Sequence, residues 1–325
     1  MVTIKDVARE ASVSPATVSR VVNGLVGYSE TTRVRVEQAV RSLGYEPDSL
    51  ARGLKTRQTS VIGVLAPFVS DALASHVMSG VEDAARTSGY AVMLGRTGLK
   101  SVFVEPYLRM LRTYRAAGVV LISTVINPSF RGVLGRDVPM VSVAITDGSG
   151  SPSISVDDDQ AAYDGTRFLL GLGHRRIGLL TGNAESVFVA ERRTNGYLRA
   201  MTEARCAAVV ARGDFSYASG APGLRELLGQ DPHLSAVFAV SDEMGAAVVN
   251  ELQRMGRRVP RDVSVLGFDD TATAQHVNPP LSTIAQPLHQ MGEMAVRKLL
   301  HARDLRPRVL PHRIIERGTT APFAA

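Results

Sequence analysis

From residue 61 onward, short apolar runs alternate with longer segments in which apolar residues recur at helical spacing. The runs are rich in valine, leucine and alanine, a composition typical of strands buried on both faces of a parallel sheet. They occupy residues 61–65, 90–94, 118–122, 139–143, 176–180, 207–210, 236–240 and 263–268. Helices are expected around residues 75–88, 104–116, 160–172, 191–204, 218–228 and 242–255.

This order of elements predicts two doubly wound α/β subdomains. The runs before and after residue 160 form two successive series of strand–helix–strand units, and each series can build its own sheet. Ligands of such sheets bind beyond the carboxyl ends of the strands. A cleft between the two subdomains is therefore the expected ligand site.

The first sixty residues have a different pattern, which predicts three short helices. Thr3 can cap the first helix with Asp6 as its capping-box partner, Ser14 can cap the second ahead of Pro15, and Ser29 can cap the third. Gly24 and Gly44 are suited to the helix exits. The apolar stripes are Ile4, Val7, Ala8 and Ala11, then Val18, Val21 and Val22, then Val36, Ala39, Val40 and Leu43. Together they predict a minimal three-helix core.

The second helix presents a small, polar outer face. Only about two residues separate it from the first helix, which is the spacing of a helix-turn-helix. Its outer residues are Pro15, Ala16, Ser19, Arg20 and Asn23. Such a face fits the DNA major groove, where an arginine can bond guanine and a methyl group can contact thymine. From the pattern alone, an ordinary solvent-exposed helix face is an equally good interpretation.

Residues 46–60 predict a linker that contains a marginal helix. Pro47 breaks the preceding structure, and Asp48 or Ser49 can cap one short helix that ends at Lys55. A helix of about seven residues is barely stable alone in water, and Gly53 weakens it further.

Composition limits the class of protein. A chain of 325 residues predicts two or three structural units, and the single cysteine, Cys206, excludes an internal disulfide. No run of about 18 apolar residues and no secretory leader occurs, so we expect an intracellular, cytoplasmic protein without a membrane partner. The net charge is +6, and residues 1–58 hold nine basic and six acidic residues. This balance weakly favours a polyanionic partner.

Enzyme signatures are absent from the sequence. No GxxxxGK, GxGxxG, HExxH or GxSxG pattern occurs, and the seven histidines lack ligand spacing. The carboxylates of VDDDQ (residues 156–160) suggest Mg²⁺, but they directly precede a helix, where negative charge is favourable in itself. We therefore expect no catalysis, no metal and no cofactor; the competing classes are a sugar or nucleotide enzyme and a transport binding protein.

The stretches TIKDVAREASVSPATVSRVVNG and SETTRVRVEQAVRSLGYEPDSLARGLKTRQTSVIGV closely resemble the amino-terminal region of the lactose/galactose-repressor (LacI-type) family of bacterial transcription regulators. The resemblance implies that Pro15, Ala16 and Arg20 read bases. It implies that phosphate-holding or supporting roles fall on Thr3, Ser14, Thr17, Ser19, Asn23 and Thr32. Tyr28 departs from the family's small aliphatic residue, and it can either bond a phosphate or cover the core.

The segment DSLARGLK resembles the family's hinge helix, which orders on operator binding and pairs with its copy in a second subunit. Leu54 matches the leucine that wedges into the minor groove and bends the duplex. Ala51 and Arg52 would face the groove and the backbone, with Lys55 also at the DNA. A flexible tether remains the alternative.

The body resembles the family's periplasmic-binding-protein-like effector domain, through GHRRIGLLTG, RRTNGYLRAM, SDEMGAAVVNELQRMGRRVPRDVSVLGFDD and NPPLSTIAQP. The implied effector-binding residues are Leu73, Arg193, Phe215, Asp242 and Asp269. Two alternatives remain: Asp242 as a helix cap, and Arg193 with Asp269 as a structural ion pair across the cleft. Leu73 and Ala74 stand where many relatives have paired aromatics, so no particular sugar is implied.

The resemblance predicts an all-α helix-turn-helix DNA-binding domain plus an α/β effector domain of two doubly wound subdomains. The expected divisions are a DNA-binding domain at 1–46, a hinge at 47–60 and an effector and dimerisation domain at 61–325. The expected subdomains are 61–158 with 288–316, and 159–287 with 317–325, with crossings near 158–160, 286–288 and 316–319.

The expected function is that of a homodimeric repressor that binds a pseudo-palindromic operator in double-stranded DNA. A small polar effector, a sugar or sugar derivative first and a nucleobase next, would control it from the cleft. It would be cytoplasmic, and associated with the nucleoid when bound to DNA. The carboxy-terminal tail has no leucine heptads, which argues against a tetramer.

Overall fold

The computed structural model describes residues 2–22, 25–45, 59–68, 72–98, 103–182, 187–301 and 305–324. The chain divides into two compact units, Met1–Ser60 and Val61–Ala325. The predictions for Asn23, Gly24 and the hinge residues Ala51, Arg52, Leu54 and Lys55 lie outside the described residues.

The first unit contains the three predicted helices: α1 (Ile4–Glu10), α2 (Pro15–Val22) and α3 (Glu30–Leu43). The Asp6 carboxylate accepts hydrogen bonds from the N–H of Thr3 (3.0 Å) and from its hydroxyl (2.7 Å). The Ser14 hydroxyl accepts from the Thr17 N–H at 3.1 Å, and α3 ends at Gly44 in the left-handed conformation, with φ 60°. The predicted core is confirmed: Val7, Val18 and Val36 have no solvent-exposed surface.

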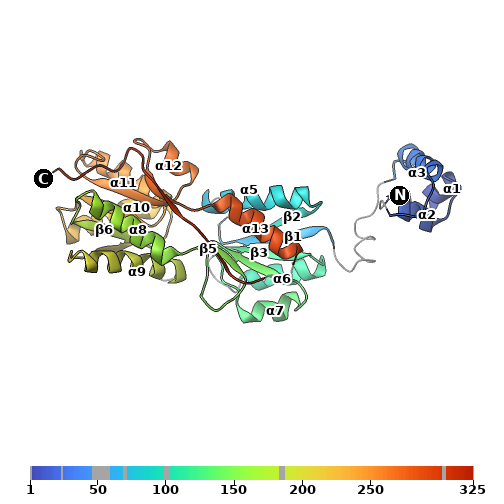
Figure 1. The fold of residues 1–325 in the computed structure, drawn as a ribbon, viewed down its shortest axis with the longest axis horizontal. Helices are drawn as coiled ribbons and strands as arrows, with labels where there is room; N and C mark the ends of the chain where they lie inside the picture. Colours follow the sequence, from blue (N-terminus) through green and yellow to red (C-terminus); the bar gives the residue numbers. More distant parts are fainter. Residues whose placement is uncertain are drawn as a thin grey trace. The chain divides into compact units, whose positions relative to one another are not determined.

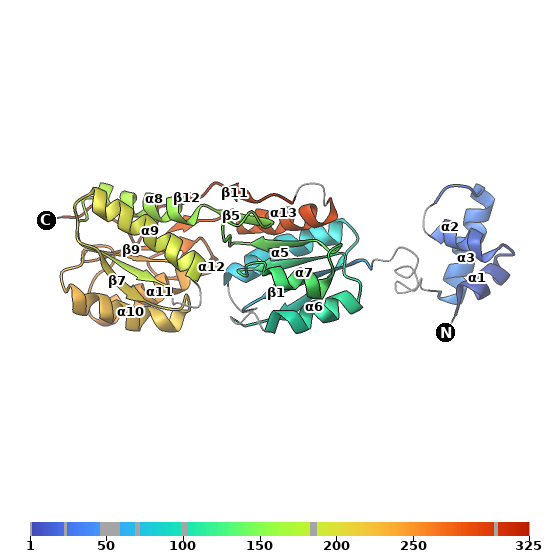
Figure 2. The same ribbon diagram turned by 90° about the horizontal axis from the view of Figure 1, so that it is seen from below.

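The second unit has two lobes, each built on a six-stranded sheet (Figures 1 and 2). In the amino lobe the strand order is β11-β5-β4-β3-β1-β2, and all pairings are parallel. Its strands are β1 (Val61–Ala66), β2 (Ala91–Arg96), β3 (Gly118–Ile122), β4 (Met140–Val143), β5 (Ser153–Val156) and β11 (Arg308–Leu310). Its helices are α5 (Ala72–Thr87), α6 (Val104–Thr113), α7 (Pro128–Leu134) and α13 (Leu288–Leu300).

The carboxy lobe has the order β12-β10-β9-β8-β6-β7, in which β12 pairs antiparallel with β10. Its strands are β6 (Ile177–Thr181), β7 (Val209–Arg212), β8 (Ala236–Ala239), β9 (Ser264–Asp269), β10 (Ser282–Ala285) and β12 (Arg313–Ile315). Its helices are α8 (Asp158–Gly171), α9 (Val187–Glu203), α10 (Tyr217–Gln230), α11 (Asp242–Arg254) and α12 (Ala272–His276). The predicted fold class, two doubly wound subdomains, is confirmed.

All eight predicted strands are present, with ends shifted by at most two residues. The elements that were not predicted are β5, β10, β11, β12, α7, α12 and α13. The strands β11 and β12 have only three residues each, so their pairing depends on the strands beside them. The helix α13 had a readable signal, because its buried residues Leu288, Met291, Ala295 and Leu299 recur at helical spacing.

The chain passes between the lobes three times: after β5, after β10, and between β11 and β12. The third crossing was predicted near residues 316–319, and this is wrong. Arg308–Leu310 pairs with β5 in the amino lobe, whereas Arg313–Ile315 already pairs with β10 in the carboxy lobe. The crossing therefore falls between Leu310 and Arg313.

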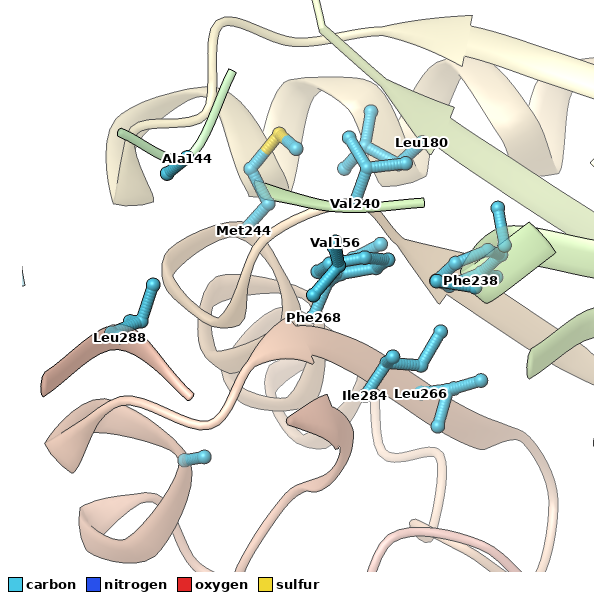
Figure 3. Packing of buried hydrophobic residues seen from close by; sticks show 14 of the residues in the cluster. Ala144, Val156, Leu180, Phe238, Val240, Met244, Leu266, Phe268, Ile284 and Leu288 are labelled. Atoms are coloured by element: carbon cyan, nitrogen blue, oxygen red, sulfur yellow. The ribbon is translucent and has the colours of Figure 1, made fainter. Parts of the chain in front are cut away.

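One buried core includes residues of both lobes, and a second lies within the amino lobe. One cluster packs the face of the amino sheet under α5 and α13 and continues through the carboxy lobe. Figure 3 shows part of it, with Ala144 and Val156 of the amino lobe labelled together with Leu180 and Phe268 of the carboxy lobe. A second cluster packs α6 and α7 onto the other face of the amino sheet.

Candidate functional site

The outer face of α2 carries the predicted base-reading residues. Pro15, Ala16 and Arg20 are exposed, whereas Val18 and Val21 on the opposite face are buried. The helix is therefore divided into a core half and a surface half, as the sequence predicted. This placement is what a reading role requires, and the role itself stays a prediction.

Most of the hydroxyls predicted to hold phosphates lie at the starts of helices, whereas Ser19 lies within α2. Ser14 and Thr17 share a hydrogen bond of 2.9 Å, and Thr32 and Ser29 share another of 2.9 Å. Thr3 donates to Asp6, and Ser19 is half-buried. Tyr28 packs half-buried against the three-helix core, which favours the packing alternative for this residue.

In the second unit, the structure places Arg193 at the centre of a buried polar cluster. Its side chain is only 2% exposed. Its Nε donates to Asp158 Oδ1 at 2.8 Å, and its Nη1 donates to the Val240 carbonyl at 2.6 Å. Its guanidinium lies 3.5 Å from the ring centroid of Phe268, and its Nη1 lies 3.6 Å from Asp269 Oδ1. The charge is therefore balanced by two carboxylates and a π face.

Close packing of two helices puts Arg193 in this position. A Cβ on Gly196 would collide with the Asp159 carbonyl and with the backbone N of Tyr163, so only glycine lets α9 approach the start of α8 this closely. Asp158 is the first residue of α8, and Arg193 lies about one turn before Gly196. Burial raises the pKa of Asp158, and the neighbouring Arg193 opposes this rise.

The ion pair between Arg193 and Asp269 exists, but it does not cross the cleft. Arg193 belongs to α9 and Asp269 ends β9, and both elements are in the carboxy lobe. The cross-cleft form of the structural alternative is therefore wrong. Asp269 has a left-handed φ of 112°, and Gln286 donates to its Oδ1 at 2.7 Å. Gln286 was not predicted from the sequence, and its signal was its place just after β10 at the second crossing.

Asp242 is the first residue of α11, and both of its carboxylate oxygens have partners in the structure. Its Oδ2 accepts from the N–H of Thr271 at 2.6 Å, and its Oδ1 accepts from the Thr283 hydroxyl at 2.5 Å. The alternative that Asp242 caps α11 is wrong. Ser241 is the N-cap of this helix, and its hydroxyl accepts from the Met244 N–H at 3.2 Å. Effector contact by Asp242 stays a prediction.

Burial raises the pKa of Asp242 from 3.8 to about 7, against the opposing effect of the threonine hydrogen bonds. A folded-state pKa above the ordinary value means that the folded state binds this proton more tightly than the unfolded state. The stabilisation is fully present below pH 3.8 and is lost as the pH rises to about 7.

The variant Asp242→Asn is therefore expected to remove this loss. Wild-type stability should fall relative to the variant as the pH is raised through this window, measured by urea unfolding at a series of pH values. The control is Asp262→Asn. Hydrogen bonds from Arg258 lower the pKa of Asp262 to about 2, so this carboxylate is ionised in the folded protein throughout that window. Its replacement should leave the pH profile parallel to that of the wild type in that window. Parallel pH profiles for wild type and Asp242→Asn would contradict the assignment.

The Phe215 carbonyl accepts from the Ser241 hydroxyl at 3.0 Å, beside the polar cluster, whereas Leu73 lies on the other lobe. Phe215 has a left-handed φ of 68°, and its ring covers Gly182 so closely that a Cβ there would collide with it. Leu73 is half-buried on α5 of the amino lobe and packs against the large apolar cluster. The structure therefore brings together Arg193 and Asp269, with Phe215 just after the edge strand β7 of the same sheet and Leu73 on the other lobe.

The three carboxylates of VDDDQ diverge. Asp157 accepts from the Gln160 N–H at 3.2 Å as the N-cap of α8, Asp158 binds Arg193, and Asp159 pairs with Arg199 at 2.6 Å. Within the described ranges, no group of three or more His, Cys, Asp or Glu side chains could hold a metal ion. The described helices are also too short or too polar to span a bilayer.

A helix-turn-helix unit joined to a two-lobed α/β unit defines a class of transcription regulators. Residues 3–48 match the family of bacterial regulatory proteins of the lacI type, and residues 166–320 match the periplasmic binding protein-like domain. Catabolite control protein A of Priestia megaterium is 33% identical over 329 residues, covering 98% of this chain and 99% of the relative. The chain belongs to the lacI family.

Other relatives are also transcription regulators. The ribose operon repressor of Haemophilus influenzae is 33% identical and covers 92% of this chain and 91% of its own length. The lac repressor dimer bound to operator and the anti-inducer ONPF matches with a TM-score of 0.89 and 28% identity, covering 98% and 99% of the two chains. The regulator CelR in complex with cellobiose matches with a TM-score of 0.72 and 30% identity, covering 98% and 100%.

Proposed function

We propose that this chain is a homodimeric repressor whose affinity for a pseudo-palindromic operator is set by a small polar effector in the cleft. The effector is a sugar or sugar derivative first and a nucleobase next. The protein acts in the cytoplasm, on the nucleoid when bound to DNA, and it binds the effector without converting it. The observation that carries the effector assignment is the buried cluster around Arg193 and Asp269.

The DNA-binding half of the proposal rests on α2. Arg20 is exposed and can donate two hydrogen bonds to guanine, while Pro15 and Ala16 leave room for close approach to the base pairs. Thr3, Ser14, Thr17, Ser19 and Thr32 offer hydroxyls for phosphates. The roles of Asn23, Ala51, Arg52, Leu54 and Lys55 are proposed from the family resemblance alone.

The effector half rests on where the polar groups lie. Arg193 touches the Val240 carbonyl just after β8, and Asp269 ends β9, so both are at the carboxyl ends of parallel strands. Phe215 follows β7, and we assign its ring to stacking on a ring of the effector. Hydroxyl groups of a polyol match this arrangement of donors and acceptors, and the related regulator CelR was solved with cellobiose.

Regulation would act through the crossings between the lobes. An effector that contacts both lobes favours one of their relative arrangements, and a shift in that population alters the energy of ordering the hinge on DNA. A ligand with equal affinity for both arrangements would change nothing.

The dimer is supported by the edge of the amino sheet. The edge strand β2 leaves Leu94 41% exposed, and α5 beside it contributes Met78 and Ser75 to a shallow pocket of about 270 Å³. Among the described strands β2 lies at the edge of its sheet, and a second copy would cover this edge. The matched lac repressor structure is also a dimer.

The effector proposal predicts a rise in melting temperature with one class of ligand. A ligand at 100 times its Kd stabilises the folded state by about 2.7 kcal/mol, which raises the melting temperature of a unit of this size by several degrees. A screen of sugars, polyols, nucleobases and amino acids measures it, with Asp269→Asn as the variant expected to lose the response. The recovered ligand should be chemically unchanged. An equal rise in the variant would contradict the assignment of Asp269.

A further inference from the structure

One end of the amino lobe is strongly basic. This end carries the loops that precede the parallel strands, together with the end of α13. The cations there are Arg86, Arg112, Arg115, Arg136, Arg297, Lys298, Arg306 and Arg308. Among the described residues 86–90, 112–117, 135–139, 297–301 and 305–308, the one acidic residue is Asp137. All of the arginines are exposed.

Several contacts place these segments at the same end as Val61, where the chain enters from the first unit. The Ala117 N–H donates to the Val61 carbonyl at 2.8 Å, just after Arg115. The Val119 N–H donates to the Pro139 carbonyl at 3.0 Å, just after Arg136. A Cβ on Gly118 would lie 3.0 Å from the Leu299 side chain, which places the end of α13 here as well.

The spacing of the strands sets the width of this surface. Arg308 is the first residue of β11, and β3 and β11 are separated by three strand intervals in the sheet. At about 4.8 Å per interval the two strand starts lie about 14 Å apart. Arg86 precedes β2, two intervals beyond β3, so the whole row of cations spans five intervals, about 24 Å. A duplex carries one negative charge per about 1.7 Å of its axis, so a row of this length can meet several phosphates.

Some of these charges have acidic partners one helical turn away. Arg86 pairs with Asp83 at 2.6 Å, and Arg297 pairs with Glu293 at 3.2 Å. Arg112 instead donates to the carbonyl of Val133 at 3.2 Å. A carbonyl carries no net charge, so this contact does not neutralise the arginine. The cleft end of the same lobe, in contrast, carries the carboxylates Asp147 and Asp157 after β4 and β5.

We infer that this basic end of the amino lobe is a second, sequence-independent phosphate-binding surface, which contacts the DNA backbone beside the base pairs read by α2. The inference rests on the proposed DNA-binding function and adds a contact made by the effector unit itself. Guanidinium groups bond phosphate oxygens in pairs, and all but one of the eight cations are arginines.

DNA is favoured over an acidic protein as the partner for two reasons. The chain that joins the DNA-reading unit to this lobe enters at Val61, at this same end. The fully buried core of a protein–protein interface is largely apolar, whereas the exposed side chains of these segments are mainly arginines and other polar residues. Because phosphate contacts carry no sequence information, the surface adds affinity for all DNA equally.

The test compares two charge-matched triple variants of the full chain. The first is Arg112→Gln with Arg115→Gln and Arg136→Gln, on the basic end. The control is Arg205→Gln with Arg254→Gln and Arg261→Gln, which removes the same charge from exposed positions of the carboxy lobe. Thermal melting should show all three proteins folded, because surface substitutions change stability little.

Affinity is measured against salt concentration on a random-sequence duplex and on a site that the wild type selects from a randomised pool. The first variant should reduce the slope of log K against log salt by about 0.9 for each phosphate that the protein no longer neutralises. The reduction should be the same on both DNAs, and their affinity ratio should stay unchanged. The control should match the wild type in slope.

An unchanged slope in the first variant would overturn the inference, and this is also the outcome if the surface binds an acidic protein. A reduction confined to the selected site would overturn it as well, because it would indicate a role in sequence reading. Failure of the proposed function is a separate result: the wild type would then select no site at all.

Discussion

Replacing Arg193 by alanine is expected to lower the free energy of unfolding of the second unit by about 3–5 kcal/mol. The substitution would leave Asp158 and Asp269 buried without their cation, and it would leave the Val240 carbonyl without its donor. It would also empty the space over the Phe268 ring. The destabilisation comes mainly from keeping the two carboxylates buried without a cation, and less from the lost attraction between them and Arg193.

Urea unfolding of the full chain measures this effect. The matched control is Arg199→Ala on the same helix, whose pair with Asp159 is 42% and 36% exposed and should contribute about 1 kcal/mol or less. Arg193→Lys keeps the charge but loses the planar guanidinium group. Its free energy of unfolding should lie between those of the wild type and Arg193→Ala. A destabilisation by Arg193→Ala no larger than that of the control would contradict the buried cluster.

Arg20→Ala is expected to weaken binding to a selected DNA site by about 1–3 kcal/mol, through one base-pair position. Arg20 is the arginine on the outer face of α2, and the neighbouring Ala16 and Pro15 cannot replace its paired hydrogen bonds to guanine. The specificity at that position should relax, while the other positions keep theirs.

Competition binding with each single base-pair variant of the selected site measures the loss of affinity and the specificity at each position. Arg35→Ala, which removes an exposed arginine from α3, controls for the change in charge. An equal weakening on every base-pair variant and on random DNA would mean that Arg20 contacts only phosphate, and it would contradict the base-reading role.

The elements with strong local patterns could be predicted from the sequence. The apolar runs at 118–122 and 263–268 became β3 and β9 with bounds equal or shifted by one residue, because strands buried on both faces must be apolar throughout. The start of α2 at Pro15 also followed from local chemistry, through the Ser14 cap.

The crossings and the buried polar partners could not be predicted in the same way. Three-residue strands such as Arg308–Leu310 carry too little pattern to distinguish them from loops. Asp242 finds its partners in Thr271 and Thr283, which are 29 and 41 positions away along the chain. Such pairings depend on the assembled sheets.

The candidate site illustrates the same limit. The resemblance to the family pointed to Arg193 and Asp269, and the fold places them within 3.6 Å of one another. It did not reveal that Asp158 is the closer partner of Arg193, at 2.8 Å. An effector that bonds Arg193 must therefore join or displace a network that is already complete within one lobe.

The proposed function is tested most directly by the affinity for a selected pseudo-palindromic site, measured with and without the ligand found in the melting screen. Binding is expected to be at least about a thousandfold tighter than to random DNA, and to change by about 5- to 150-fold when the ligand is added. Equal affinity for the two DNAs, or an affinity that the ligand leaves unchanged, would contradict the proposal.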